Sequence, residues 1–539
     1  MSLQFPARAA SRAVPVERRS LAVIFSALML AMLLAALDQT IVSTALPTIV
    51  GDLGGLTELS WVVTAYILTS TVSTPLYGKF GDIYGRKRIF QGAIVVFLAG
   101  SMLCGISQNM TELIGFRALQ GIGAGGLMVG AQAIIGDVVS PRERGRYMGY
   151  FGAVFGLATV AGPLLGGFFV DHASWRWVFY VNVPLGALAL VMTQIALHLP
   201  RRRHEHRMDY LGAALLAAGV ACIVLFTTWG GTQYPWGSGQ IVGLGVAGAV
   251  LLVAFGFVER AAAEPILPLR LFRSANFTLV NIVGFIVGLA LFGSIVFLPQ
   301  YLQIVKGDGA TNSGLLLVPM MAGVLVTSIV SGQLISRTGR YRYWPILGTA
   351  IMAAGLYLLS TMGPGTPVGV TAGYMVVVGL GIGGVMQVLV LLAQNAVAPR
   401  DLGTATSTAT FFRSMGGSIG LPIFGSVFSN LLAGNLARSL PAGFHLAGLS
   451  GGTGNASPQV LSTLPPPIHT AVVHAFSQSL GGVFLAGVPV AILAFVLVWL
   501  IREVPLRTRV GAAMEGVQET LGSSATAAGG TEVRVAAGR

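Results

Sequence analysis

Two charged residues lie inside long apolar stretches of this sequence, where a charge is costly. Asp38 follows the apolar run 21–37, and Arg117 lies in a run that begins near Thr111. On insertion scales a charged side chain at the centre of a bilayer costs about 2.5–3.5 kcal/mol, so such residues face a partner or a water-filled cavity. Asp38 could therefore bind and release a proton. Arg117 could control that step by pairing with a carboxylate, for which Asp38 is the candidate.

Both residues also have structural interpretations. Asp38 could be held by hydrogen bonds from its neighbours Gln39 and Thr40. Arg117 could extend to the nearer membrane surface, although it lies about 9 Å along its helix at 1.5 Å per residue. Because intramembrane acids are usually functional, we favour the proton-coupling interpretation.

Two glycine-containing segments have spacings that ordinary packing does not require. In the segment 78–88, Gly81 and Gly85 permit a tight turn, and Asp82 could stabilise a helix N-terminus or pair with an arginine. We interpret this segment as a gate made by Gly78, Asp82, Gly85, Arg86 and Arg88. The second segment predicts a hinge or a close contact between helices, with ordinary small-residue packing as the alternative. Its residues are Gly162, Pro163, Gly166 and Gly167.

Uncharged polar residues and a second arginine also interrupt the apolar runs. Some could line a central cavity for a substrate, and others could hydrogen-bond between helices; the sequence does not sort them. The cavity candidates are Gln39, Gln120, Asn281, Gln387 and Arg413.

Composition places the chain in a membrane. Of its 539 residues, 54% are hydrophobic and 9% are charged, whereas soluble domains carry about 25% charged residues. So few charges cannot form a water-compatible surface, and lipid must cover the chain. The net charge of +13 does not indicate nucleic-acid binding, because the basic residues lie in short loops between apolar runs rather than on one face.

Fourteen apolar runs approach the length of about 20 residues that spans a bilayer. They are 21–47, 60–78, 89–106, 111–137, 145–170, 176–197, 210–229, 238–258, 276–303, 313–336, 344–362, 367–398, 404–430 and 479–501. Lys and Arg concentrate in alternate loops. We therefore expect those loops and both termini to be cytoplasmic, in a multi-pass protein of the plasma (inner) membrane.

An internal repeat divides the chain. Residues 78–88 are echoed at 332–342, residues 121–126 at 379–384, and Pro141-Arg142-Glu143 at Pro399-Arg400-Asp401, with offsets of 254, 258 and 258 residues. We predict an all-α integral membrane protein with two six-helix bundles and two inserted helices. Parallel repeats with a site at their interface are typical of alternating-access transporters.

This repeat gives the predicted domains. They are an N-terminal segment 1–20, a first bundle 21–200, a linker with two inserted helices 201–275, a second bundle 276–504 and a tail 505–539. The second bundle includes a predicted external loop, 431–478, with a short helix around 468–476.

Patterns from soluble enzymes occur, but their context is wrong. Residues 121–126 and 379–384 fit GxGxxG, and 416–420 fit GxSxG, yet none follows a predicted strand. The histidines lie in or beside loops; His204 and His206 could bind a metal weakly, but a solvated linker is the better interpretation. We therefore expect neither an enzyme nor a metal or cofactor site.

These motifs together resemble the major facilitator superfamily, and specifically its fourteen-span drug:proton antiporters. The resemblance rests on 37–47 in the first helix, 78–88, 117–125, 162–167 and 175–186. Ser43, Ala158 and Ile83 depart from the usual residues of these motifs but leave the charged positions intact.

The resemblance implies an exporter of amphipathic compounds driven by inward proton flow, with Asp38 and Arg117 in proton coupling. The alternative is a dedicated exporter of one endogenous metabolite, antibiotic, siderophore or lipid. A monomer that needs no protein partner and binds no nucleic acid is the expected form.

Overall fold

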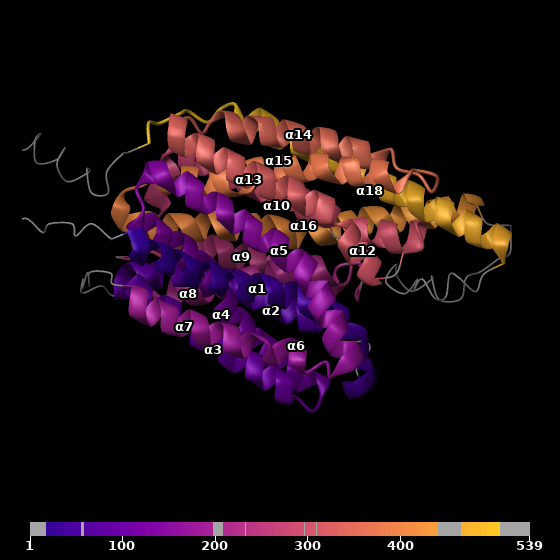
Figure 1. Cartoon of the computed structure of the whole chain (residues 1–539), viewed down its shortest axis with the longest axis horizontal. Helices are drawn as coiled ribbons and strands as arrows, with labels where there is room; N and C mark the ends of the chain where they lie inside the picture. Colours follow the sequence, from indigo (N-terminus) through magenta and orange to yellow (C-terminus); the bar gives the residue numbers. More distant parts are fainter. Residues whose placement is uncertain are drawn as a thin grey trace, which may run out of the picture.

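The computed structural model describes residues 18–54, 59–197, 209–231, 233–262, 264–295, 297–308, 310–439 and 465–506. Within these ranges the regular structure is helical, apart from an isolated bridge between Gly230 and Tyr234. The glycine patterns that match soluble enzymes therefore lie in helices, as the sequence predicts. Figure 1 shows long helices that run along the length of the molecule, with those of the first half of the chain (indigo to purple) beside those of the second half (orange to yellow).

The first half of the chain forms the N-terminal bundle. Its helices are α1 (Arg18–Leu53), α2 (Leu59–Tyr84), α3 (Arg86–Ile106), α4 (Met110–Val138), α5 (Pro141–His172), α6 (Trp177–Tyr180) and α7 (Asn182–Ala196). Local chemistry sets several of their ends. Asn109 caps α4 by accepting a hydrogen bond from the Glu112 backbone at 2.9 Å, and α5 starts at a proline, which has no N–H to leave unpaired.

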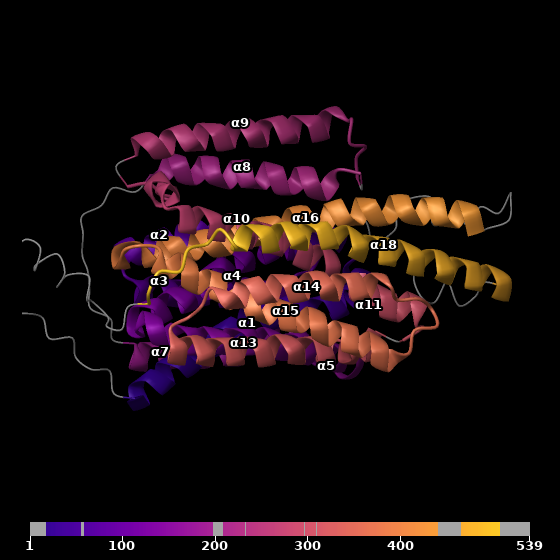
Figure 2. The same cartoon turned by 90° about the horizontal axis from the view of Figure 1, so that it is seen from above.

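The second half contains the inserted pair and the C-terminal bundle. The inserted helices are α8 (Tyr210–Trp229) and α9 (Gly239–Ala261). The bundle is η2 (Leu269–Arg273), α10 (Ala275–Ile295), α11 (Phe297–Gln300), η3 (Tyr301–Val305), α12 (Ala310–Leu316), α13 (Val318–Thr338), α14 (Tyr343–Ser360), α15 (Val368–Asn395), η4 (Pro399–Asp401), α16 (Leu402–Ser439) and α18 (Pro466–Val498). Figure 2 shows α8 and α9 as a separate layer on one side.

Twelve helices of the described residues are long and apolar enough to cross a membrane. The other two predicted spans, 60–78 and 276–303, correspond to α2 and α10. The predicted span 276–303 is helical on both sides of Val296, which lies outside the described residues: α10 covers its first part, and α11 and the π-helix η3 cover the rest. Both α2 and α10 pack against α16 within the bundle.

The predicted external loop 431–478 is helical at both ends. Helix α16 continues to Ser439, and α18 begins at Pro466, so the predicted helix around 468–476 is the first part of a longer one. Apolar residues along these ends explain the extension, since Leu432, Val472 and Phe476 are buried in the C-terminal core. Residues 440–464 lie outside the described ranges. The same holds for residues 1–17 of the predicted N-terminal segment 1–20, for residues 198–208 and for most of the tail.

The internal repeat reappears as matching glycine contacts. In each bundle two glycines of the fourth helix press against the helices on either side of it, where a Cβ would overlap the neighbour. The pairs are Gly121 with Tyr66 and Gly123 with Phe97 in the first bundle, then Gly379 with Met320 and Gly381 with Met352 in the second. The glycines are related by an offset of 258 residues and the residues that they touch by offsets of 254 and 255, close to the offsets of the sequence repeat.

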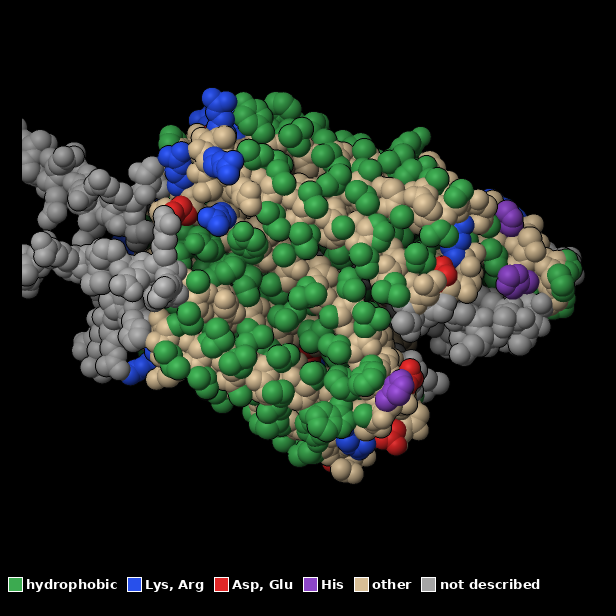
Figure 3. Space-filling model, in the orientation of Figure 1, with side chains coloured by type: hydrophobic (Ala, Val, Ile, Leu, Met, Phe, Trp, Pro, Cys, Tyr) green, Lys and Arg blue, Asp and Glu red, His purple; other side chains and the backbone are tan. Residues whose placement is uncertain are grey.

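The two bundles meet at what we call the basic end, formed by the turns α2–α3, α4–α5, α13–α14 and α15–α16. Lys and Arg side chains gather at this end in Figure 3. Helix α5 packs on α13, and α2 packs on α16. Gly149 lies against the Ser328 carbonyl, and Gly78 lies against the Ser407 side chain. Small residues thus bring the backbones of the two halves close together.

At the end of the molecule opposite the basic end, polar contacts join helix α1 to another segment of the first bundle. Asp52, at the end of α1, accepts hydrogen bonds from the Trp175 indole at 2.8 Å and from Arg176 at 3.2 Å. The Trp175 hydrogen bond, followed by that of Arg176, lowers the pKa of the exposed Asp52 carboxyl. These contacts fix α1 to the segment that precedes α6.

We expect Gly149→Ala to destabilise the protein by about 1–3 kcal/mol, because its Cβ would collide with the Ser328 carbonyl across the two halves. Gly167→Ala is the matched control, since nothing lies within 4 Å of a Cβ at Gly167 on the same helix. Thermal unfolding in detergent measures both. Equal melting temperatures for the two variants would contradict this contact.

Candidate functional site

Asp38 and Arg117 form a buried ion pair between α1 and α4. The Arg117 Nη1 donates to Asp38 Oδ2 at 2.5 Å. The side chains are 0% and 2% exposed, so both charges are removed from solvent. The sequence proposed this pairing, and the geometry confirms it. The alternative in which Arg117 extends to the surface is wrong.

Neutral amides satisfy the rest of the carboxylate. Asp38 Oδ1 accepts from Gln120 Nε2 at 2.7 Å and from Asn182 Nδ2 at 3.1 Å. Gln120 also accepts from Arg117 at 2.9 Å, which closes a ring of three side chains. Both carboxylate oxygens therefore have donors, as a buried charge requires.

Arg117 has further partners of its own. Its Nε donates to the Val62 carbonyl at 3.3 Å, and its guanidinium lies 4.2 Å from the centre of the Tyr66 ring. A ring face attracts a cation. Arg117 thus keeps favourable contacts on α2 and with Gln120 that do not depend on the charge of Asp38.

Neither sequence neighbour of Asp38 holds it. Thr40 donates instead to the Ala158 carbonyl on α5 at 2.9 Å, and Gln39 is exposed. The sequence analysis missed Asn182 and Tyr66 as members of this site. Asn182 carried a signal, since it is a buried polar residue at the start of an apolar helix.

Asp82 connects the two bundles at the basic end. Its carboxylate accepts hydrogen bonds from the backbone N–H groups of Gly403 and Thr404, at 3.2 and 2.8 Å, and from the Thr404 hydroxyl at 3.0 Å. These groups form the N-terminus of α16, where a negative charge is stabilised. Asp82 also pairs with Arg86 at 2.9 Å. Asp82 therefore stabilises a helix N-terminus and also pairs with an arginine, the two alternatives that the sequence suggested.

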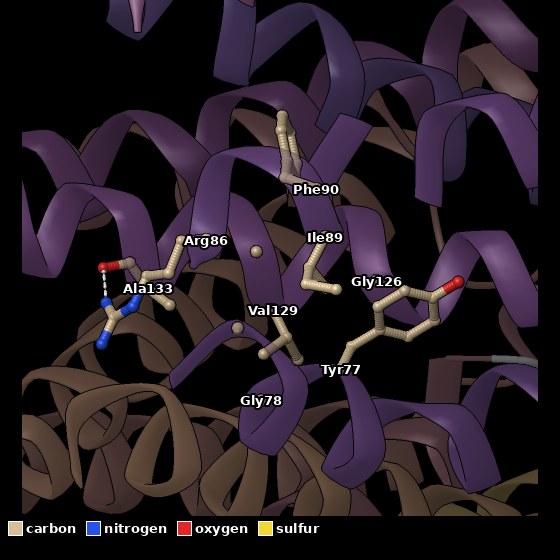
Figure 4. Close-up of a pocket in the computed structure, with 10 residues that line it drawn as sticks. Tyr77, Gly78, Arg86, Ile89, Phe90, Gly126, Val129 and Ala133 are labelled. Atoms are coloured by element: carbon tan, nitrogen blue, oxygen red, sulfur yellow. Dashed lines mark hydrogen bonds between the residues drawn. The ribbon is translucent and has the colours of Figure 1, made fainter. Parts of the chain in front are cut away.

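Arg86 connects the contact of Asp82 with α16, which we call the Asp82 clasp, to helix α4. It pairs with Asp137 at 3.0 Å and donates to the Ala133 carbonyl. Figure 4 shows Arg86 along a small pocket between α2, α3 and α4, lined mostly by apolar residues and glycines. Gly85 supplies the turn with a φ of 93°, whereas Gly81 lies within α2. Arg88 is exposed and is not brought into the clasp.

A clasp of opposite charge lies on the other side of the basic end. Arg142, at the start of α5, donates to the carbonyls of Ser336 and Arg337 at 3.0 and 2.7 Å. These carbonyls belong to the last turn of α13, where a positive charge is stabilised. An anion at a helix N-terminus and a cation at a helix C-terminus therefore hold the two halves together.

The glycines of α5 hold the helix that carries Asp38. Gly162 and Gly166 lie against Thr40 and Thr44 of α1, with no room for a Cβ. Pro163 instead faces Gly314 of α12, in the other bundle, and Gly167 has no close neighbour. Helix α5 is continuous from Pro141 to His172, so this segment forms close contacts rather than a break in the helix.

The structure separates the five cavity candidates. Gln120 belongs to the Asp38 site, and Gln39 is exposed although it lies deep in α1. Asn281 and Gln387 are buried in α10 and α15, and the side-chain oxygen of each lacks a partner among the described residues. Arg413 is buried in α16. No group of three His, Cys, Asp or Glu in the described ranges is placed to hold a metal, and His204 and His206 lie outside them.

The site and the repeated bundles agree with comparisons to known proteins. A family model described as Major Facilitator Superfamily matches residues 28–421. The chain belongs to this superfamily. The resemblance seen in the sequence is thereby confirmed, and the chain is a multi-pass membrane transporter of small molecules.

Curated relatives include named multidrug proteins. An uncharacterized MFS-type transporter of Mycobacterium tuberculosis (strain ATCC 25618 / H37Rv) is 46% identical over 492 residues, covering 91% of this chain and 70% of that protein. Multidrug transporter protein MdtP of Bacillus subtilis (strain 168) is 42% identical, covering 77% and 76%. Multidrug resistance protein 3 of the same organism is 37% identical, covering 89% and 95%.

Solved structures share the fold. The human organic anion transporter MFSD10 (TETRAN) has a TM-score of 0.59 at 14% identity, covering 90% of this chain and 100% of that one. The proton:xylose symporter XylE has a TM-score of 0.57 at 14% identity, covering 90% and 96%. At this identity the likeness concerns the fold alone.

Removing one partner of the buried pair should be costly. We expect Arg117→Met to destabilise the protein by about 3–5 kcal/mol, because Asp38 is left without its cation. The double variant Asp38→Asn/Arg117→Met should recover most of this loss. Thermal unfolding in detergent tests the cycle; strictly additive losses would show that the two charges do not interact.

Neutralising Asp82 should loosen the basic end. Asp82→Asn removes the negative charge that stabilises the N-terminus of α16, and it also removes the ion pair with Arg86. Each contact is worth about 0.3–2 kcal/mol. Spin labels at exposed positions 84 and 400 should report a larger share of long distances than in the unsubstituted protein. Glu143→Gln, an exposed change at the same end, should leave the distribution unchanged.

Proposed function

We propose that this transporter exports amphipathic small molecules in exchange for protons, and that Asp38 carries the proton under the control of Arg117. One observation carries the proposal: the described spans hold a carboxylate that is 0% exposed and bonded to a single cation. A buried acid whose only counter-charge sits on another helix couples its protonation to the arrangement of those helices.

Protonation of Asp38 would cancel the attraction between α1 and α4. Arg117 would then keep the Val62 carbonyl, the Tyr66 ring and Gln120 as neutral partners of its guanidinium. The contacts that change belong to α1. The proton therefore acts on the position of α1 rather than on the folding of α4.

Helix α5 would transmit that change. Through Gly162 and Gly166 it is pressed against α1 just beyond Asp38, and through Gly149 and Pro163 it touches α13 and α12 of the other bundle. A shift of α1 would therefore act on the contact between the halves. Rocking of two repeats around a central site is the physical basis of alternating access.

The conformation in this structure has its basic end held shut by the clasps of Asp82 and Arg142. We assign that end to the cytoplasm, because Lys and Arg concentrate in cytoplasmic loops, and the membrane to the plasma (inner) membrane. The structure would then represent the state that accepts protons from outside. Gln39, polar and exposed deep in α1, would border the path to Asp38, since a lipid-facing position disfavours an amide.

Export is the direction that the relatives support, since they include proteins named as a multidrug transporter, a multidrug resistance protein and an efflux pump. We propose a monomer, without catalytic activity and without a nucleic-acid partner.

The test is uphill efflux of a fluorescent amphipathic dye from cells without their major pumps. Asp38→Asn should reduce efflux at least about tenfold, as loss of an essential coupling group does, and a protonophore should act alike. Asp52→Asn is the control, because it makes the same substitution on α1 at an exposed carboxylate. Unchanged pumping by Asp38→Asn would rule out its role. No efflux by the unsubstituted protein, when it is present in the membrane, would favour a dedicated metabolite exporter.

A further inference from the structure

The C-terminal bundle contains one charged side chain deep within its helices. Between 276 and 504 the acidic residues are Asp308, Asp401 and Glu503, all outside the α-helices. Arg413 lies about 17 Å along α16 from Leu402, at 1.5 Å per residue. A bilayer core is about 30 Å thick, so this depth is near its centre.

Arg413 is buried without a partner. Its exposed fraction is 8%, and among the described residues its side chain makes no hydrogen bond or ion pair. A buried guanidinium without an anion is costly, and proteins keep such groups where they have a use.

Gln387 lies at the same depth. Gln394 of α15 donates to Thr406 of α16 at 2.9 Å, which sets the register of these antiparallel helices. Counting about two helix turns from that contact along each helix leads to Gln387 on α15 and Arg413 on α16, so the two residues lie at similar depth. Gln387 is also buried, at 4% exposed, and its Oε1 has no partner in the described ranges. The Arg413 guanidinium and the Gln387 side-chain oxygen, both without a described partner, thus lie at similar depth in the second bundle.

The charges of the two bundles are not balanced. In the first bundle the charge of Asp38 is compensated by Arg117, whereas in the second bundle Arg413 adds a positive charge that no described acid compensates. A cationic compound would be repelled there. A compound with a carboxylate would supply the missing anion, in the two-point geometry that guanidinium groups favour.

We propose that Arg413 binds the carboxylate of the transported compound, so that amphipathic acids and zwitterions are among its substrates. The proposal rests on the transport function above, but not on its proton coupling. Gln387 completes the polar side of this site, and the apolar residues around it contact the rest of the compound.

The test is equilibrium binding to the purified protein in nanodiscs, which needs no proton gradient. The probes are two dyes, each used as the free acid and as its methyl ester: dansylphenylalanine and carboxytetramethylrhodamine. For at least one pair the acid should bind about tenfold more tightly than the ester, as expected for a charge-assisted hydrogen bond. Arg413→Gln should abolish this preference, and Arg413→Lys should retain part of it.

Arg438→Gln is the matched control, because it makes the same change at an exposed position of the same helix. It should leave the preference for the acid intact. If no pair shows a preference, whether because acid and ester bind alike or because neither binds, the proposal is overturned. If the Asp38→Asn variant still exports the dye, proton coupling through Asp38 is rejected. The binding test described here is unaffected by that outcome.

Thermal stability separates binding from a structural role. Because an unpaired buried charge opposes folding, Arg413→Met should raise the melting temperature of the ligand-free protein by about 2–4 °C. A fall of the melting temperature together with equal loss of acid and ester binding would show that Arg413 supports the fold, and would also overturn the proposal.

Discussion

The structure depends on how a charge is kept inside a membrane. Asp38 and Arg117 are tolerable there only because each is the other's counter-ion and the remaining groups have hydrogen-bond partners. The pair draws α1, α4 and α7 into one assembly, with Asn182 reaching from α7. Any change in the charge of Asp38 must alter this assembly. That is why a single carboxylate can connect a proton to the position of a helix.

Close backbone packing is the second constraint, and it lets the change spread. Lipid supplies no hydrophobic drive between helices, so they associate through small residues and shape. Glycines of α5 contact α1 on one face and α13 on another, so one helix links the proton site to the boundary between the bundles. At the basic end Asp82 and Arg142 meet helix termini of the other bundle. These contacts are polar, few and exposed at their edges, and such contacts can form and break as the halves move.

Much of this arrangement could be predicted from the sequence because membrane helices obey strong local rules. Length and hydropathy locate the spans, and the repeat pairs the bundles. The cost of charge in lipid identifies Asp38, Arg117 and Arg413 as exceptional. Predictions failed where tertiary contacts override local pattern. The ends of the predicted loop 431–478 are helical because their apolar residues join the C-terminal core.

The sequence by itself determined the fold class, the family and the residues that a membrane would have to accommodate, because hydropathy, loop charge and motif spacing act along the chain. Only the tertiary structure decided their partners. Asn182 and Tyr66 join Asp38 and Arg117 from distant helices, Asp82 finds the N-terminus of α16, and Arg413 finds no described partner. The reason is physical: hydrogen bonds and ion pairs depend on distances of a few ångströms between helices, and helix packing sets those distances.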